Sequence, residues 1–518
     1  MLRLRTAVVG VSAIGLALGM SMSNASASPP SWSHAGGVRV LRVGTWRGAP
    51  GQFSTIQAAV NAARPGDWVL VAPGDYHETG TPEDGVSITT PNLHVRGLDR
   101  NAVVVDGTRN GAPQCSSDAK DQGAKGRNGI EVFEANGVTI ENLTACNFLN
   151  GGGGGNEIWW NGGDGSGTQN LSAFRGAYLS ATSTYWKSDH DPRAEYGIFV
   201  SNTTGPGTFA HTYASNMADS AYYVGACPDC NTILDDAHGQ YSALGYSGTN
   251  SGGHLIVRNS EFDNNNTGFS TNSQNNDDAP SPQDGVCPNN GTGPTGSHSC
   301  WLFTNNFVHD NNNANVPRSG SAALGPPGVG IVISGGRTDM VMNNRFENNG
   351  SWAVLLVPFI DTGTPPPIAH CEGGIDDFLG LGCYYGDWGN EVAHNTFVNN
   401  GFFGNPTNGD LADLSDVHDP GNCWHDNTDP DGLTSAPANI QATHAVCGIP
   451  NGGEAVLGSD LSNQVICASE LFGPCDPSVG NYPRTTTVVM PSLTAQPTMP
   501  DPCADVPANS WCPGGKGR

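Results

Sequence analysis

The sequence predicts an all-β solenoid, and the main observation is a short apolar block that recurs at steps of 23 or 24 residues. A repeat period in the low twenties is typical of a solenoid, in which each coil buries its apolar face only against its neighbours. The block occupies residues 197–200, 221–224, 245–248, 268–271, 330–333 and 353–356.

The second half of each repeat supports this prediction. It consists of short β-branched or aromatic runs with alternating polarity, bounded by Asn and Gly, which predict strands rather than helices. Asn tolerates the left-handed backbone region that tight corners need, and a buried Asn can hydrogen-bond to the next coil. These runs occur at residues 138–143, 256–265, 302–307, 342–350 and 392–401.

This repeat resembles the right-handed parallel β-helix of the pectate-lyase-like superfamily, and more narrowly the secreted bacterial proteins with parallel β-helix repeats. The resemblance covers residues 53–402. It implies a binding groove along one outer sheet, with acids, bases and Ca²⁺ ligands projecting from adjacent coils. A fold of this kind hosts many activities, so the resemblance is specific for the fold and weak for the reaction.

An N-terminal capping helix is expected at residues 53–63, with Ser54 as its N-cap. In the superfamily such a helix closes the open end of the β-helix, where apolar surface and strand edges would otherwise be exposed. A strand is expected to follow at residues 68–72. The buried face of the helix would consist of Ile56, Ala59, Val60 and Ala63.

The first 27 residues read as a secretory signal peptide. Arg3 and Arg5 precede an apolar run, and Ala25-Ser26-Ala27 forms a small-residue cleavage site. A membrane anchor is the alternative, but the apolar run is short for a span. We therefore expect an extracellular protein without an anchor. The expected organisation is a lead-in at 28–52, the β-helix at 53–402, an irregular disulfide-stapled cap at 403–482 and a loosely ordered tail at 483–518.

The 14 cysteines favour disulfides in an exported protein. Cys227-Pro228-Asp229-Cys230 is also compatible with a redox or zinc site, although the surrounding sequence lacks the usual context for either. Near neighbours predict local loop staples between Cys227 and Cys230, Cys287 and Cys300, Cys371 and Cys383, Cys467 and Cys475, and Cys503 and Cys512.

The formal net charge of −26 argues against nucleic acid and anionic lipid as partners. A polyuronate would also be repelled unless Ca²⁺ or a local basic patch intervened. An acidic surface also simply keeps an exported protein soluble. We expect a monomer whose partner is an extracellular polysaccharide.

Three insertions are expected to interrupt the coils, near residues 151–191, 272–299 and 358–387. Aromatic side chains on such loops stack on sugar faces or, alternatively, seal the loop against the coil. The expected substrate-binding residues are Trp159, Trp160, Trp186, Tyr222, Tyr223 and Tyr241.

The densest polar region runs from residue 211 to residue 278, and it holds the expected catalytic groups. A spacing of 24 residues from His211 to Asp235, and of 23 from Asp235 to Arg258, predicts that these three form one row across the coils. A charged surface stack is the alternative. The expected catalytic residues are His211, Asp219, Asp235, Asp236, His238 and Arg258, and the expected metal ligands are Asp277 and Asp278.

The resemblance implies one of three activities within the superfamily, and each has its own motif. Polygalacturonase-like hydrolases carry an Asp-Asp pair followed by Gly-His-Gly, compared with Asp235-Asp236 and Gly252-Gly253-His254-Leu255 here, but the chain has no Asn-Thr-Asp element before this pair and no Arg-x-Lys element. Epimerases of mannuronan carry Asp-Pro-His-Asp, whereas residues 189–192 hold the same residues in another order. Ca²⁺-dependent lyases suggest ligands among Asp219, Asp235 and Asp236, with Arg258 as base.

The resulting expectation is a secreted carbohydrate-active protein, either a polysaccharide lyase, an epimerase or a glycoside hydrolase, with Ca²⁺ as its possible cofactor. The alternatives are a non-catalytic glycan-binding protein and a structural or adhesion protein of the cell exterior.

Overall fold

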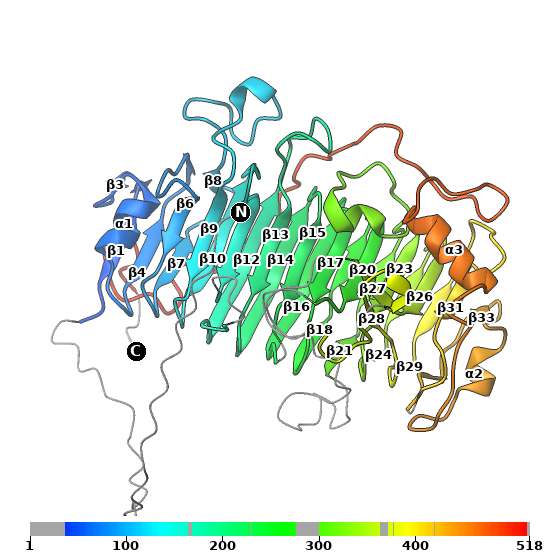
Figure 1. The fold of residues 1–518 in the computed structure, drawn as a ribbon. Coiled ribbons are helices and arrows are strands. Elements are labelled where there is room, and N and C mark those ends of the chain that lie inside the picture. Colours follow the sequence, from blue (N-terminus) through cyan, green and yellow to red (C-terminus); the bar gives the residue numbers. More distant parts are fainter. Residues whose placement is uncertain are drawn as a thin grey trace, which may run out of the picture. The chain divides into compact units, whose positions relative to one another are not determined.

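The computed structural model describes residues 37–163, 168–227, 229–275, 300–362, 371–376, 378–418 and 420–514. The predicted signal peptide, Asp277, Asp278 and Cys287 lie outside these residues. The unit that starts at Val38 consists of parallel strands stacked in successive coils (Figure 1). Strand pairing therefore confirms the predicted parallel β-helix.

Two parallel sheets run the length of the coils. They differ in their number of strands, and we call the 11-stranded sheet the short sheet and the 18-stranded sheet the long sheet. The short sheet contains β6 (Asp84–Ile88), β9 (Asn128–Phe133), β11 (Asn156–Asn161), β13 (Tyr196–Ser201), β15 (Ser220–Gly225), β17 (Leu244–Thr249), β20 (Thr267–Asn272), β23 (Val329–Ser334), β26 (Trp352–Val357), β31 (Gly409–Asp413) and β33 (Ser435–Ala436). The long sheet contains β1 (Val40–Val43), β4 (Trp68–Val71), β5 (Gly74–Tyr76), β7 (His94–Gly97), β8 (Val103–Asp106), β10 (Thr139–Cys146), β12 (Phe174–Thr182), β14 (Gly207–Ser215), β16 (Thr232–Gln240), β18 (Leu255–Arg258), β19 (Glu261–Asp263), β21 (Trp301–Thr304), β22 (Phe307–His309), β24 (Met340–Met342), β25 (Arg345–Glu347), β29 (Glu391–Ala393), β30 (Thr396–Val398) and β32 (Cys423–His425).

The coils extend beyond both predicted ends. Strand β1 pairs with β4, so the first coil begins before residue 53. Strands β31, β32 and β33 continue the stacking after residue 402, inside the region expected to be irregular. The first predicted insertion is also wrong in part, because residues 151–191 include the regular strands β11 and β12. Glycine-rich segments before β11 and between β11 and β12 interrupt the sequence pattern on both sides of β11.

The region of the third predicted insertion contains strands that do not belong to the two parallel sheets. It forms an antiparallel hairpin of β27 (Phe359–Asp361) and β28 (Cys383–Tyr385), and the Cys371–Cys383 disulfide closes it. A second antiparallel pair, β2 (Thr45–Trp46) and β3 (Ala49–Pro50), lies at the other end of the chain. Short 3-10 helices occur at Ala119–Asp121, Gly320–Leu324 and Phe378–Gly380.

The long sheet bends along one column of residues with left-handed backbone, which we call the corner column. In several coils, the residue that follows the corner residue is an Asn whose side chain faces inward. The side-chain amides of these residues form a ladder of hydrogen bonds from Asn306 to Asn344, to Asn395 and to Asn427. The sequence-based expectation of Asn corners and coil-to-coil amide bonds is therefore confirmed. The corner column consists of Tyr178, His211, Asp236, Asn259, Asn305, Asn343, His394 and Asp426.

The interior between the sheets is apolar, and helices close both ends of it. Helix α1 (Ile56–Ala62) buries Ile56, Ala59 and Val60, as predicted, whereas Ala63 follows the last helical residue and is only partly buried. Its N-cap is Thr55 rather than Ser54, because the Thr55 hydroxyl accepts a hydrogen bond from Ala58 N. The carboxylate of Glu78 accepts from the backbone N–H groups of Ile56 and Gln57 in the first turn. Helices α2 (Ile440–Thr443) and α3 (Asp460–Ser469) lie near the other end (Figure 1).

The C-terminal segment differs from the loosely ordered tail that we expected. Residues 483–514 return along the coils as a strap, which Figure 1 shows in red above the strands. Its partners lie on coils from the middle of the β-helix to the first coil: Asn315 for Val489, Asn216 for Pro491, Asn101 for Gln496, Asn142 for Met499 and Ala49 for Trp511. Trp511 is buried against Trp68 and Leu98, which anchors the end of the strap.

Four of the five predicted disulfides are formed: Cys227–Cys230, Cys371–Cys383, Cys467–Cys475 and Cys503–Cys512. Two more, Cys115–Cys146 and Cys423–Cys447, were not predicted because their partners are more distant in sequence. Among the described residues, no helix has the length and apolarity needed to cross a bilayer.

Candidate functional site

A groove of about 1000 Å³ follows the outer surface of the long sheet over six successive coils, from β14 to β30. One wall is the corner column, and the other consists of residues two positions further along each strand. The strap contributes Gln496 and Pro497. The polar and charged lining includes Arg100, His211, Asp236, His238, Asn259, Glu261, Asn305, Asn343, Arg345 and His394.

The backbone at the corner explains why this lining is polar. Among residues other than Gly, the left-handed region is least costly for Asn, Asp and His. His211 (φ 56°), Asp236 (φ 54°) and Asn259 (φ 50°) all adopt it. The requirement for a tight corner therefore places short polar side chains side by side at the edge of the groove.

His211 and Asp236 form a pair within this column. Nδ1 of His211 bonds to a carboxylate oxygen of Asp236, and the ring of Tyr178 lies 4.6 Å from the imidazole, centroid to centroid. Both side chains remain partly open to solvent. Because the carboxylate holds Nδ1, Nε2 is the nitrogen that can accept or release a proton toward a ligand.

The predicted row of His211, Asp235 and Arg258 is only partly correct. Strands β14 and β16 pair at a step of 25 residues, so Ala210, not His211, lies beside Asp235. Asp235 does bond to Arg258, with 2.8 Å from Nη2 to Oδ2, and to Asn259. Burial alone would raise the pKa of Asp235, but these bonds lower it below its ordinary value. Neither Asp235 nor Arg258 lines the groove.

Arg100 connects the groove to the strap. Its buried guanidinium donates to the carbonyl oxygens of His211 and Pro497 and to the hydroxyl of Ser180. Burial lowers the pKa of Arg100 to about 10, so it stays charged at neutral pH. Sequence reasoning missed this residue because its partners lie up to 397 positions away.

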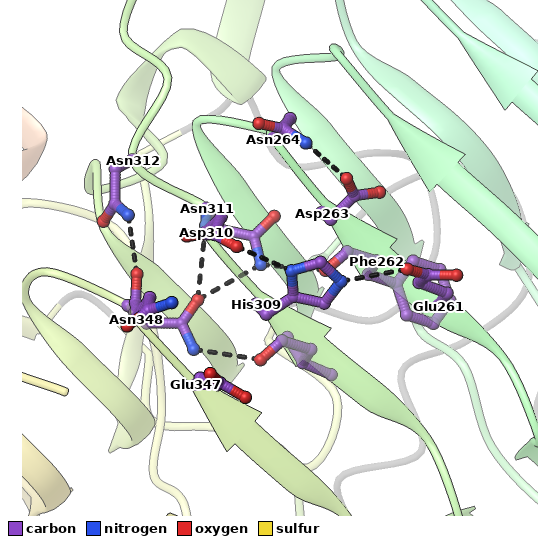
Figure 2. A network of polar contacts seen from close by, with 12 residues as sticks. Glu261, Phe262, Asp263, Asn264, His309, Asp310, Asn311, Asn312, Glu347 and Asn348 are labelled. Atoms are coloured by element: carbon purple, nitrogen blue, oxygen red, sulfur yellow. Dashed lines mark hydrogen bonds and ion pairs between the residues drawn. The ribbon is translucent and has the colours of Figure 1, made fainter. Parts of the chain in front are cut away.

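A second polar cluster borders the groove at His238 and Glu261. His238 Nε2 lies 2.6 Å from Asp263 Oδ1, and His309 Nε2 lies 2.9 Å from Glu261 Oε1. Figure 2 shows His309 between Glu261 and Asp310. Of this cluster, only His238 was expected from the sequence; the outward alternation in the predicted strands at 256–265 and 302–307 was the signal for the others.

Two expected substrate-binding residues are wrong. Trp160 is fully buried and contacts Phe209 inside the coils. Tyr222 is also buried, and its hydroxyl donates to Thr212 Oγ1. The period-2 alternation turns Trp160 and Tyr222 inward and their neighbours Trp159 and Tyr223 outward.

Trp159 and Tyr223 lie on the outer face of the short sheet, away from the groove. The ring of Phe199 stacks on Trp159 at 5.0 Å and meets Tyr223 edge-on at 4.7 Å. Asp219 lies nearby and accepts from the Tyr196 hydroxyl. Burial and the charge of Glu195 raise the pKa of Asp219 to about 7. The other two expected binding residues, Trp186 and Tyr241, are half-buried and do not line the groove.

The carboxylates suggested as Ca²⁺ ligands do not converge. Asp219 bonds to Tyr196 on the short sheet, Asp235 bonds to Arg258, and Asp236 bonds to His211. Because Ca²⁺ takes six to eight oxygen ligands, these three residues do not fit one calcium site. Asp277 and Asp278 lie outside the described residues.

No family model matches this sequence, and no curated protein matches it in sequence. Solved structures with a similar course of the chain include the A-module of mannuronan C-5 epimerase AlgE4 from Azotobacter vinelandii, with 13% identity and a TM-score of 0.43 over 78% of this chain and 96% of that one. A mannuronic acid specific polysaccharide family 6 lyase from human gut microbiota has 13% identity and a TM-score of 0.40 over 80% and 85%. At such identity these likenesses concern the fold alone.

Proposed function

We propose that this protein is an exported carbohydrate-active enzyme whose groove binds an acidic polysaccharide. In this proposal it is a lyase or an epimerase, and the His211–Asp236 pair moves the proton. The observation that carries the proposal is a partly open imidazole, held at Nδ1 by a carboxylate, on the wall of a groove that crosses six coils.

The length and lining of the groove support a linear glycan as the ligand. Six coils at ~4.8 Å per step span about 24 Å. The amides of Asn259, Asn305 and Asn343 offer donors and acceptors for sugar hydroxyls.

The charges in the groove support an acidic glycan. Arg345 lines the wall four coils from His211, which corresponds to about 19 Å. Its half-exposed guanidinium pairs with Glu347 and lies over the ring of Phe307. In this proposal the carboxylate of a sugar unit distant from the reacting one takes the place of Glu347. Together with Arg100, it places two guanidinium groups along a groove of a chain whose formal net charge is −26.

The chemistry proposed for His211 is general acid–base catalysis. Neutral Nε2 would take the proton from the ring carbon next to the sugar carboxylate. In a lyase the electron pair then forms a carbon–carbon double bond and the glycosidic oxygen leaves. In an epimerase a proton returns to the same carbon from the opposite face. A positioned base of this kind contributes 10²- to 10⁴-fold to the rate.

The test is a screen of the purified secreted protein on pectate, alginate, glycosaminoglycans and neutral plant glycans. A lyase gives products that absorb at 235 nm, and an epimerase changes the sugar composition without cleavage. Reducing ends without that absorbance would replace the proposal by a hydrolase that uses the groove carboxylates Asp236 and Glu261. Binding without any product would replace it by a glycan-binding protein.

The matched control for His211→Asn is His190→Asn. His190 also lies beside an aspartate, Asp189, but it is almost fully exposed and lies outside the groove. The proposal requires loss of product formation in the first variant and wild-type rates in the second.

A further inference from the structure

Four side chains with metal-binding chemistry converge on three adjacent strands of the long sheet. His238 is on β16, Glu261 and Asp263 are on β19, and His309 is on β22. The strand register places Glu261 beside His238 and His309 beside Asp263. The four side chains therefore occupy the corners of one small patch on the outer face.

The ligand atoms in this patch are close together. Those of His238, Glu261 and Asp263 all lie within 4.8 Å of one another. Two diagonal bonds cross the patch: His238 Nε2 to Asp263 Oδ1 at 2.6 Å, and His309 Nε2 to Glu261 Oε1 at 2.9 Å. Ligands on a tetrahedral ion with bonds of ~2.0–2.1 Å are about 3.3 Å apart, so these two bonded pairs would open by less than ~1 Å. His309 is not part of the group within 4.8 Å, so binding one ion also requires it to move toward His238 and Asp263.

The imidazole of His309 is already oriented for binding. Its Nδ1 lies 2.8 Å from Asp310 Oδ2, which leaves Nε2 directed toward Glu261 (Figure 2). A carboxylate behind a ligating histidine is the usual outer partner in metal sites, because it fixes the tautomer and the ring orientation. Asp263 is likewise held, by the amide of Asn264.

We propose that His238, Glu261, Asp263 and His309 bind one divalent transition-metal ion of the Zn²⁺ class, with Asp310 as the residue that positions His309. Two imidazoles with two carboxylates suit Zn²⁺, Co²⁺ or Mn²⁺, whereas Ca²⁺ prefers oxygen ligands throughout. The site goes beyond the proposed enzymatic function and does not depend on it. Since His238 and Glu261 line the groove, an ion can enter from there.

Other clusters of the described residues are weaker. The sets Cys423–His425–Cys447 and Asp106–Cys115–Cys146 contain cysteines that are already joined in disulfides. The set His394–His425–Asp426 is more exposed. A variant of this cluster, His425→Asn, is therefore the comparison in the experiment.

The experiment uses the full secreted chain, freed of any affinity tag and stripped with chelator. Equilibrium dialysis against Zn²⁺, Co²⁺, Mn²⁺ or Ca²⁺, followed by elemental analysis, gives the number of bound ions per chain. The absorption bands of Co²⁺ report histidine ligation directly. We expect one equivalent of Zn²⁺ or Co²⁺ with a rise in melting temperature, and none of Ca²⁺ at this site.

Matched His→Asn variants locate the ion. His238→Asn and His309→Asn should each weaken binding at least 100-fold, and Asp310→Asn should weaken it 10- to 100-fold. His254→Asn is the control, because His254 pairs with the carboxylate of Asp229 at 2.9 Å and belongs to none of the possible metal-ligand groups found among the described residues. Asn also tolerates the left-handed backbone of that position.

Two results would overturn the proposal. One is wild-type metal content in both His309→Asn and Asp310→Asn, with circular dichroism showing that the variants fold. The other is loss of the ion only in His425→Asn, which would assign it to the more exposed cluster. The absence of any bound transition metal in the wild-type protein would have the same meaning as the first.

Discussion

His211 contacts Asp236 although the two residues are 25 positions apart, because each occupies the left-handed corner of its own coil. The same corner that ends one strand segment and begins the next turns both side chains into the groove. A constraint of the fold thereby supplies a histidine with a carboxylate partner. Since both side chains are partly exposed, the pair contributes only about 0–1 kcal/mol to stability, which leaves it free to serve a ligand.

The asparagine ladder should be a major source of stability. The Asn344 side chain accepts from Asn306 N at 2.9 Å and donates to Phe303 O at 2.9 Å, and it is buried. Asn344→Ala leaves both buried groups without these bonds, so we expect the free energy of unfolding to fall by about 2–5 kcal/mol. Urea denaturation measures it. Thr396→Ala, at an exposed position of the adjacent coil, should stay within about 0.5 kcal/mol of the wild type.

Glu131 should make stability depend on pH. Burial, together with the neighbouring Asp84, raises the pKa of Glu131 to about 8. The folded state therefore holds a proton that the unfolded state releases at a much lower pH, and stability falls as pH rises from the ordinary glutamate range toward about 8. Glu131→Gln should flatten this part of the melting-temperature profile, whereas Glu83→Gln, an exposed neighbour, should leave it as in the wild type. An unchanged slope in Glu131→Gln would contradict the assignment.

The strap should detach when its anchor is removed. Trp511 is buried, and its indole N–H donates to Ala49 O at 3.1 Å. Trp511→Ala should expose residues 496–512 to hydrogen exchange while the strands of both sheets stay protected. Phe472→Ala removes an aromatic ring that is 70% exposed and serves as the control. Equal protection of the strap in both variants would show that its other hydrogen bonds suffice to hold it.

Much of the fold was predictable because it follows from a repeating pattern. The apolar blocks located the strands of the short sheet, and the Asn-bounded runs located the ladder that includes Asn344. The site was less predictable because it depends on register. The predicted step of 24 residues between β14 and β16 places Asp235 beside His211, whereas the observed step of 25 places Asp236 there. The alternation that separates Trp159 from Trp160 was hidden by the surrounding glycines, and Arg100 meets the strap only through the full fold.

The most direct test of the proposed function compares two adjacent carboxylates. Asp236 faces the groove and holds His211, whereas Asp235 bonds to Arg258 outside it. On the polysaccharide that the screen identifies, we expect Asp236→Asn to lower the rate of product formation 10²- to 10⁴-fold and Asp235→Asn to keep it within a few-fold of the wild type. Wild-type activity in Asp236→Asn, or a larger loss in Asp235→Asn, would contradict the account.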